Sequence, residues 1–243
     1  MLSCFAIALF TSASLLFWVQ PMIAKMILPA LGGSPSVWNT CMVFFQAVLL
    51  AGYLYAHLGR KWFGERQQAI VHLALFAAAI ATLPLSLEIH PPEGTGNPSL
   101  WLFTRLGISA GLPLFVISAT APMLQSWFSR TGHPHASDPY FLYGASNLGS
   151  MTALFAYPAA IEPFLSRTAQ SRAWTLGYLA LGGLILACAA LAGRTAGDKT
   201  EEAQSGAGSG SASESPLEIL RWVALAFAPS SLLLGVTTLI TTD

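Results

Sequence analysis

The chain opens with LSCFAIALFTSASLLFWVQPMIAKMIL (residues 2–28), in which Lys25 is the single charged residue. A helix needs about 20 apolar residues to cross the roughly 30 Å hydrocarbon core of a bilayer, and this stretch is long enough. Further apolar stretches of similar length cover residues 38–58, 69–87, 100–128, 140–164, 174–192 and 217–240. The pattern predicts an all-α, polytopic integral membrane protein with a transmembrane helix in each stretch.

The composition supports this prediction and excludes other classes of protein. Charged residues make up 9% of the chain and hydrophobic residues 54%, whereas about a quarter of a soluble domain is charged. The net charge is zero, so no basic surface is predicted and we expect no nucleic-acid partner. The three cysteines lack CxxC spacing, which predicts neither a disulfide framework nor a zinc site. The partner that the composition predicts is the lipid bilayer.

The stretch GRTAGDKTEEAQSGAGSGSASESP (residues 193–216) divides the chain. Its Gly, Ser, Ala and charged residues bury too little apolar surface to become ordered. We therefore expect a six-helix transmembrane domain over residues 1–192, a flexible linker over 193–216, and a seventh helix over 217–243 that begins a second half. Seven of the eleven Lys and Arg residues lie in this linker region or in loops on its side of the membrane. The positive-inside tendency then predicts a cytoplasmic linker and a cytoplasmic N-terminus.

An internal repeat lies within the first six predicted helices. ASLLFWVQPMIAKM in the first helix resembles VISATAPMLQSW in the fourth, and Pro21 corresponds to Pro122, 101 residues later. A three-helix unit crosses the membrane an odd number of times, so two successive copies must have opposite orientations. Inverted repeats of this kind are common in transporters. We expect two inverted three-helix repeats.

Lys25 has two interpretations. A first helix over residues 5–30 would be roughly 39 Å long at about 1.5 Å per residue, which is longer than the hydrocarbon core. Lys25 would then lie near the outer headgroups, where its side chain can reach water and anchor the helix. In the alternative interpretation, Lys25 contacts a ligand, a lipid or another helix.

The stretch GYLYAHLGRKWFGER (residues 52–66) ends the second predicted helix and enters the following loop. Its pattern, formed by Gly52, Gly59, Arg60 and Lys61, is similar to the motif between the second and third helices of major facilitator transporters. The resemblance implies a cytoplasmic loop in which small residues allow close helix packing and the cations hold the cytoplasmic end. The family's acidic residue is replaced by Ala56 or His57, so its charge relay is not implied. A basic loop that only follows the positive-inside tendency is the alternative, with His57 and His72 beside it at the membrane interface.

Three more stretches extend this resemblance, namely LPALGGSPSVWNTCMVFFQAVLLAGYLYAH, DPYFLYGASNLGSMTALFAYP and FAPSSLLLGVTTLITTD. With them, the chain resembles the N-terminal membrane part of the bacterial fused major-facilitator/spermidine synthase-like proteins. The resemblance implies a six-helix major-facilitator-like bundle in the bacterial inner membrane, a polyamine-related role, and a C-terminal or separate synthase-like domain as partner.

Catalysis in that family belongs to a domain with a strand, a glycine-rich loop for decarboxylated S-adenosylmethionine, and acidic residues for the amine. No such sequence occurs among these 243 residues. We therefore expect no catalytic residue and no cofactor in this chain.

Polar residues within the predicted spans are candidates for a site, because polar groups in lipid need partners. Asn39 and Gln46 are seven residues apart on one face of the second helix, and Gln20 and Asn147 can join them at the centre of the bundle. The sequence allows two interpretations of these four residues: the polar cavity of a small-solute transporter, or hydrogen bonds between helices without a ligand.

Acidic residues are confined to span ends and loops, so the sequence predicts no buried cation site for a polyamine. Glu162 and Asp243 are the nearest candidates for contact with a ligand. The loop residues His133, His135 and Asp138 are too few and too loosely spaced to specify zinc, and no metal site is expected. Three functions remain open: the membrane portion of a spermidine synthase-like protein, half of a small-solute transporter, and a structural membrane anchor or subunit.

Overall fold

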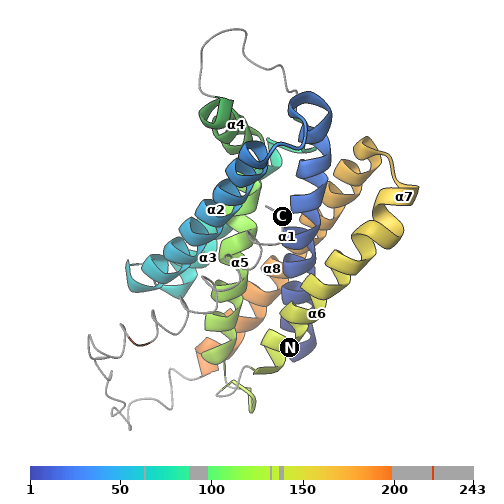
Figure 1. The fold of residues 1–243 in the computed structure, drawn as a ribbon. Coiled ribbons are helices and arrows are strands. Elements are labelled where there is room, and N and C mark those ends of the chain that lie inside the picture. Colours follow the sequence, from blue (N-terminus) through green and yellow to red (C-terminus); the bar gives the residue numbers. More distant parts are fainter. Residues whose placement is uncertain (63, 88–97, 132, 137–139, 199–220, 222–243) are drawn as a thin grey trace. The chain divides into compact units, whose positions relative to one another are not determined.

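The computed structural model describes residues 1–62, 64–87, 98–131, 133–136, 140–198 and 221. Within these residues the regular secondary structure is helical and includes no strand. The α-helices are α1 (Leu2–Leu31), α2 (Pro35–Trp62), α3 (Glu65–Ile80), α4 (Pro98–Leu106), α5 (Leu112–Ser129), α6 (Tyr140–Ala156), α7 (Glu162–Phe164) and α8 (Arg167–Asp198). Two π-helical turns, η1 (Gly107–Gly111) and η2 (Tyr157–Ile161), join α4 to α5 and α6 to α7 (Figure 1).

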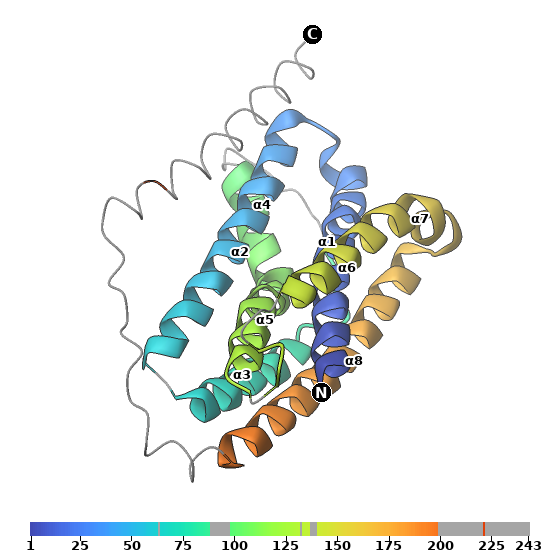
Figure 2. The ribbon, with the colours of Figure 1, turned by 90° about the horizontal axis from the view of Figure 1, so that it is seen from below.

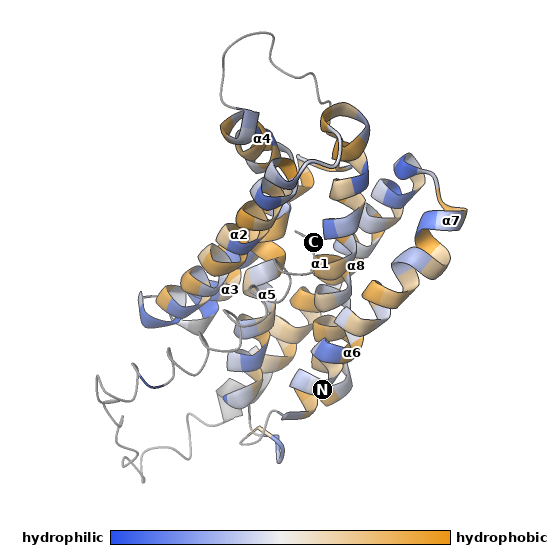
Figure 3. Cartoon of the chain, in the orientation of Figure 1, coloured by the Kyte–Doolittle hydropathy of each residue, from blue (hydrophilic) through white to orange (hydrophobic). Residues whose placement is uncertain are grey.

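Four helical segments are long and apolar enough to cross a membrane, namely Leu2–Leu31, Pro35–Trp62, Pro98–Ser129 and Arg167–Gly193. Large apolar side chains are also exposed, among them Leu50 on α2, Phe155 on α6 and Leu176 on α8. Figure 3 shows hydrophobic residues distributed over α1, α2, α6 and α8. Such a surface is costly in water and favourable in lipid. The all-α class is confirmed, and the long apolar helices agree with the membrane prediction.

Several helix boundaries differ from those of the predicted stretches, and α8, for example, begins at Arg167 instead of residue 174. α3 ends at Ile80, although the apolar stretch runs to residue 87, because the residue before Pro84 is disfavoured in a helix and proline lacks a backbone donor. α8 continues to Asp198, six residues into the predicted linker. The rest of that linker and the predicted seventh helix lie outside the described residues, apart from Arg221.

Within residues 1–198, α1 packs against α5, α6 and α8. α2 packs against α4 and α5, while α3 packs against α5 and α8. α1 and α2 diverge from their connecting turn, and α5 lies between them (Figure 2). α5 therefore packs against both helices.

The contact between α1 and α6 depends on a glycine. A Cβ atom added at Gly149 would lie 3.0 Å from the carbonyl carbon and the Cα of Phe10 and even closer to the Phe10 carbonyl oxygen. The hydroxyl of Ser14 lies 3.0 Å from the Gly149 carbonyl oxygen, to which it can donate. Small residues let helix backbones approach closely in lipid, and this crossing uses one on each helix.

The contact between α2 and α5 also depends on a glycine. A Cβ atom at Gly52 would collide with Ser118 Oγ and lie 3.0 Å from the backbone nitrogen of Ala119. The Ser118 hydroxyl lies 3.3 Å from the carbonyl oxygen of Val48 on α2 and 2.8 Å from that of Phe115 on its own helix. Again a glycine on one helix faces a serine on the other.

Candidate functional site

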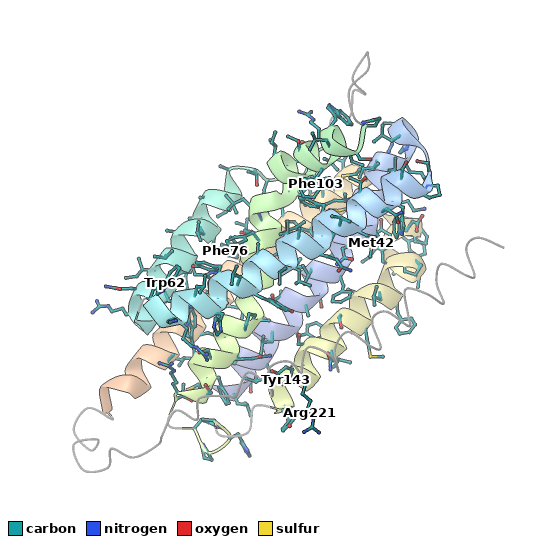
Figure 4. The ribbon with its side chains drawn as sticks, turned by 60° about the vertical axis from the view of Figure 1, so that its left-hand side comes forward. Met42, Trp62, Phe76, Phe103, Tyr143 and Arg221 are labelled. Carbon is teal, nitrogen blue, oxygen red and sulfur yellow. The ribbon has the colours of Figure 1, made fainter. Side chains whose placement is uncertain are left out.

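A cavity of about 240 Å³ lies between α1, α2 and α5. Its apolar wall includes Leu16, Phe45 and Leu114. Met42, another lining residue, lies on the α1 side of α2 (Figure 4). The cavity forms because α1 and α2 diverge while α5 supplies the floor.

The polar residues of this cavity are Gln20 of α1, Gln46 of α2 and Ser118 of α5. Ser118 already shares its hydroxyl proton between two carbonyl oxygens. Neither glutamine amide hydrogen-bonds to another residue in the described part of the chain, and each amide offers two donors and an acceptor. The lining residues include no charged side chain, so the cavity offers hydrogen-bonding groups without a formal charge.

Two of the four residues predicted to form a polar cavity, Gln20 and Gln46, thus share one cavity, and the other two do not line it. Asn39 is exposed near the beginning of α2. Asn147 is exposed on α6, where its backbone carbonyl accepts a hydrogen bond from Ser150. Asn39 and Gln46 lie seven residues apart on α2 and both side chains are exposed, but only Gln46 lines the cavity.

Lys25 and Glu162, two of the three charged residues that the sequence suggested as candidates for contact with a ligand, form an ion pair. Lys25 Nζ lies 2.5 Å from Glu162 Oε1, and the two side chains are 46% and 38% exposed. The pair connects α1 to α7, which are far apart in the sequence. Lys25 therefore contacts another helix, which was one of its two interpretations. Asp243 lies outside the described residues.

Lys25 also lines a second cavity, of about 250 Å³, at the turn between α1 and α2. The other lining residues come from the last turns of α1, the connecting turn, and the first turns of α2, including Ile27, Trp38 and Cys41. Because Cys41 precedes Met42 on α2, the two cavities follow each other along the divergent α1–α2 pair. Lys25 lies at the end that is nearer the connecting turn.

The glycines and cations of the predicted cytoplasmic motif have different environments. Gly52 is buried against α5, and Gly59 is buried beside Gln68 of α3. Arg60 and Lys61 are exposed in the last turn of α2, where cations interact favourably with the helix dipole. The two glycines therefore lie where α2 contacts neighbouring helices, and the two cations lie at its exposed end.

The sequence alone did not indicate a buried polar cluster between α2, α3 and α5. His72, expected at the interface, is fully buried because it lies seven residues into α3, about two turns from the helix end. Its Nε2 lies 3.2 Å from Thr120 Oγ1. Nearby, Gln68 Nε2 donates to the carbonyl oxygen of Ala56 at 3.1 Å. A signal was present, since His72 stands within an apolar run, and an ionisable residue inside a span is a candidate for function.

The hydrogen bonds of Thr120 determine the role of each nitrogen of His72. The Thr120 hydroxyl donates to the carbonyl oxygen of Val116 at 2.8 Å, so it accepts from His72 Nε2–H. His72 Nδ1 is then an acceptor, and it has no partner among the described residues. The Tyr55 hydroxyl is also buried without a described partner, and its ring stacks near the imidazole with centroids 6.1 Å apart.

No family model matches the chain, and no curated protein or solved structure matches it.

Proposed function

We propose that residues 1–198 form one half of a major-facilitator-like transport domain, and that the cavity between α1, α2 and α5 binds a small, uncharged, polar solute. The observation that carries the proposal is the meeting of Gln20 and Gln46 on one apolar cavity. Few polar groups set in a mostly apolar wall are typical of small-molecule sites.

The order in which the helices pack supports the two inverted repeats. The first unit consists of α1, α2 and α3, and the second consists of α4–α5, α6–α7 and α8. A two-fold axis that relates the units exchanges the α1–α6 contact with the α2–α5 contact. It likewise exchanges the α1–α8 contact with the α3–α5 contact. All four contacts occur, as the proposed symmetry requires.

The glycine crossings support the same relation. Gly149 of α6 meets Ser14 and Phe10 of α1, and Gly52 of α2 meets Ser118 of α5. In each case the second helix of one unit supplies the glycine, and the first long helix of the other supplies the serine. Helices of transporters built from inverted repeats enclose their binding sites at the interface of the repeats, and Ser118 is also part of the cavity floor.

The size and lining of the cavity limit the solute. About 240 Å³ is below the roughly 300–1,000 Å³ typical of sites for drug-sized ligands. A polyamine carries several positive charges, which would need carboxylates at this depth, whereas the described lining is uncharged. We therefore propose a neutral solute for this cavity. A polyamine-related role beside a synthase-like domain rests on the sequence resemblance alone.

The proposal is tested by ligand-induced stabilisation of the protein in lipid nanodiscs. A panel of small uncharged solutes with hydroxyl or amide groups is compared with spermidine, and a ligand present at about 100 times its Kd stabilises the folded state by about 2.7 kcal/mol. We expect a neutral solute to raise the Tm and spermidine to have no effect. The double variant Gln20→Leu/Gln46→Leu should weaken binding roughly 5- to 150-fold, since two hydrogen bonds of about 0.5–1.5 kcal/mol each are lost.

The matched control is Asn147→Leu, which removes an exposed amide outside the cavity and should leave binding unchanged. Stabilisation by spermidine in place of neutral solutes would contradict the proposed solute class. Binding of a neutral solute that survives in the double variant would exclude this cavity as its site.

A further inference from the structure

Two of the three cysteines lie in contact although 184 residues separate them. Cys4 Sγ, in the first turn of α1, is 3.5 Å from Cys188 Sγ of α8. Both thiols are free. A disulfide bond is about 2.0 Å long, so closing this gap needs a combined movement of about 1.5 Å. The side chains are thus close enough to react without a rearrangement of the helices.

The register of α1 against α8 holds the two thiols together. Leu15 of α1 contacts Gly177 of α8. Leu15 lies eleven residues after Cys4, and Gly177 lies eleven residues before Cys188. Eleven residues are close to three helical turns of 3.6 residues each, so both contacts lie on the same faces of two antiparallel helices. The Trp174 indole N–H also donates to the Leu15 carbonyl oxygen at 2.9 Å. The register of the two helices therefore places Cys4 opposite Cys188.

The two thiols differ in access. Cys188 is fully buried, whereas Cys4 is partly exposed at the beginning of α1. A reagent in solution can therefore reach Cys4 first, and Cys188 is placed to react next with the sulfur of Cys4.

The third cysteine is too distant to compete. Cys41 lines the cavity beside Ala24, and Ala24 is 20 residues from Cys4 along α1, or about 30 Å. Cys41 therefore serves as an internal control.

We propose that Cys4 and Cys188 form a redox-active pair that closes to a reversible disulfide between α1 and α8 when it meets a low-molecular-mass disulfide. The Cys4 thiolate attacks one sulfur of the small disulfide, which releases one small thiol and leaves a mixed disulfide on Cys4. Cys188 then loses its proton and attacks the Cys4 sulfur, which releases the second small thiol. Two protein thiols are oxidised and one small disulfide is reduced to two thiols.

The experiment uses oxidised glutathione as the probe, with the full chain in lipid nanodiscs. After exposure, the protein is denatured, the free thiols are alkylated with N-ethylmaleimide, and the intact mass is measured. The expected wild-type product carries one alkyl group, has lost two hydrogens and carries no glutathione. Dithiothreitol before alkylation should restore three alkyl groups, and Cys41→Ser should give a disulfide product with none.

The single variants separate the two steps. Cys188→Ser should retain glutathione on Cys4, because the second thiol is missing, whereas Cys4→Ser should retain both remaining thiols, because Cys188 is buried. Wild-type protein that keeps three alkylated cysteines, or that keeps glutathione on Cys4 as Cys188→Ser does, would overturn the proposal. A disulfide that includes Cys41 would also overturn it.

Discussion

Substitution of Gly149 by alanine tests the close packing of α1 against α6. Its added methyl group would lie 3.0 Å from two backbone atoms of Phe10, whereas ordinary van der Waals contact begins at 3.4 Å. Because the obstacle is backbone, and the Phe10 carbonyl oxygen would lie closer still, α1 and α6 would have to separate by more than about 0.4 Å. Overpacking of this kind typically costs about 1–3 kcal/mol, and the same separation would stretch the Ser14 contact with the Gly149 carbonyl oxygen.

Gly144→Ala is the matched control, because Gly144 lies on the same helix and an added Cβ would meet nothing within 4 Å. Alanine is favoured over glycine within a helix by up to about 1 kcal/mol, so this variant should be as stable as the wild type or more stable. Gly149→Ala gains the same helix propensity but loses packing. We expect it to be less stable than Gly144→Ala by about 1–3 kcal/mol.

The assay is thermal unfolding of both variants in identical lipid nanodiscs. For a domain of this size, each 1 kcal/mol changes the Tm by about 2–4 °C, so the two variants should differ by about 2–12 °C. Equal Tm values would refute the close approach of α1 and α6 and, with it, the packing argument for the paired repeats.

Three further predictions concern single contacts, each measured by unfolding in the same nanodiscs. A double-mutant cycle of Lys25→Met and Glu162→Gln should give a coupling of about 0.2–1 kcal/mol that decreases with salt, as for other solvent-exposed ion pairs; zero coupling at low salt would show that the pair contributes nothing. Thr120→Val should lower stability by about 1–3 kcal/mol because it leaves the His72 N–H without its acceptor, and Thr120→Ser should not; equal losses would contradict this bond. Trp174→Phe should cost about 0.5–1.5 kcal/mol through loss of the indole hydrogen bond across α1 and α8, and an unchanged Tm would argue that this bond is not made.

Much of the secondary structure could be predicted from the sequence, because a long apolar stretch in lipid must satisfy its own backbone hydrogen bonds as a helix. The stretches that became α1, α2, α4–α5 and α8 illustrate this rule. α3 departs from it at its end, where Pro84 interrupts a stretch that hydropathy alone would have extended to residue 87.

The candidate site was only partly predictable. Helical spacing placed Asn39 and Gln46 on one face, with Gln20 and Asn147 as residues that could join them. Which of the four line a common cavity depends on how α1, α2 and α5 pack. The environment of His72 was missed for the same reason, since its burial depends on α2 and α5 and not on the residues beside it in α3.

The sequence by itself determined that the chain is helical, where most of its helices lie, and that few charges occur within them, because these properties follow from local hydropathy and the cost of unpaired backbone groups in lipid. Only the tertiary structure decided which side chains meet. The pairing of Lys25 with Glu162 and the contact of Cys4 with Cys188 join helices that are distant in the sequence. The cavity shared by Gln20 and Gln46 is completed by α5, which is also distant in the sequence. These contacts depend on how closely the helix backbones approach each other, as they do at Gly52 and Gly149. The distance between two backbones is set by residues from several helices at once.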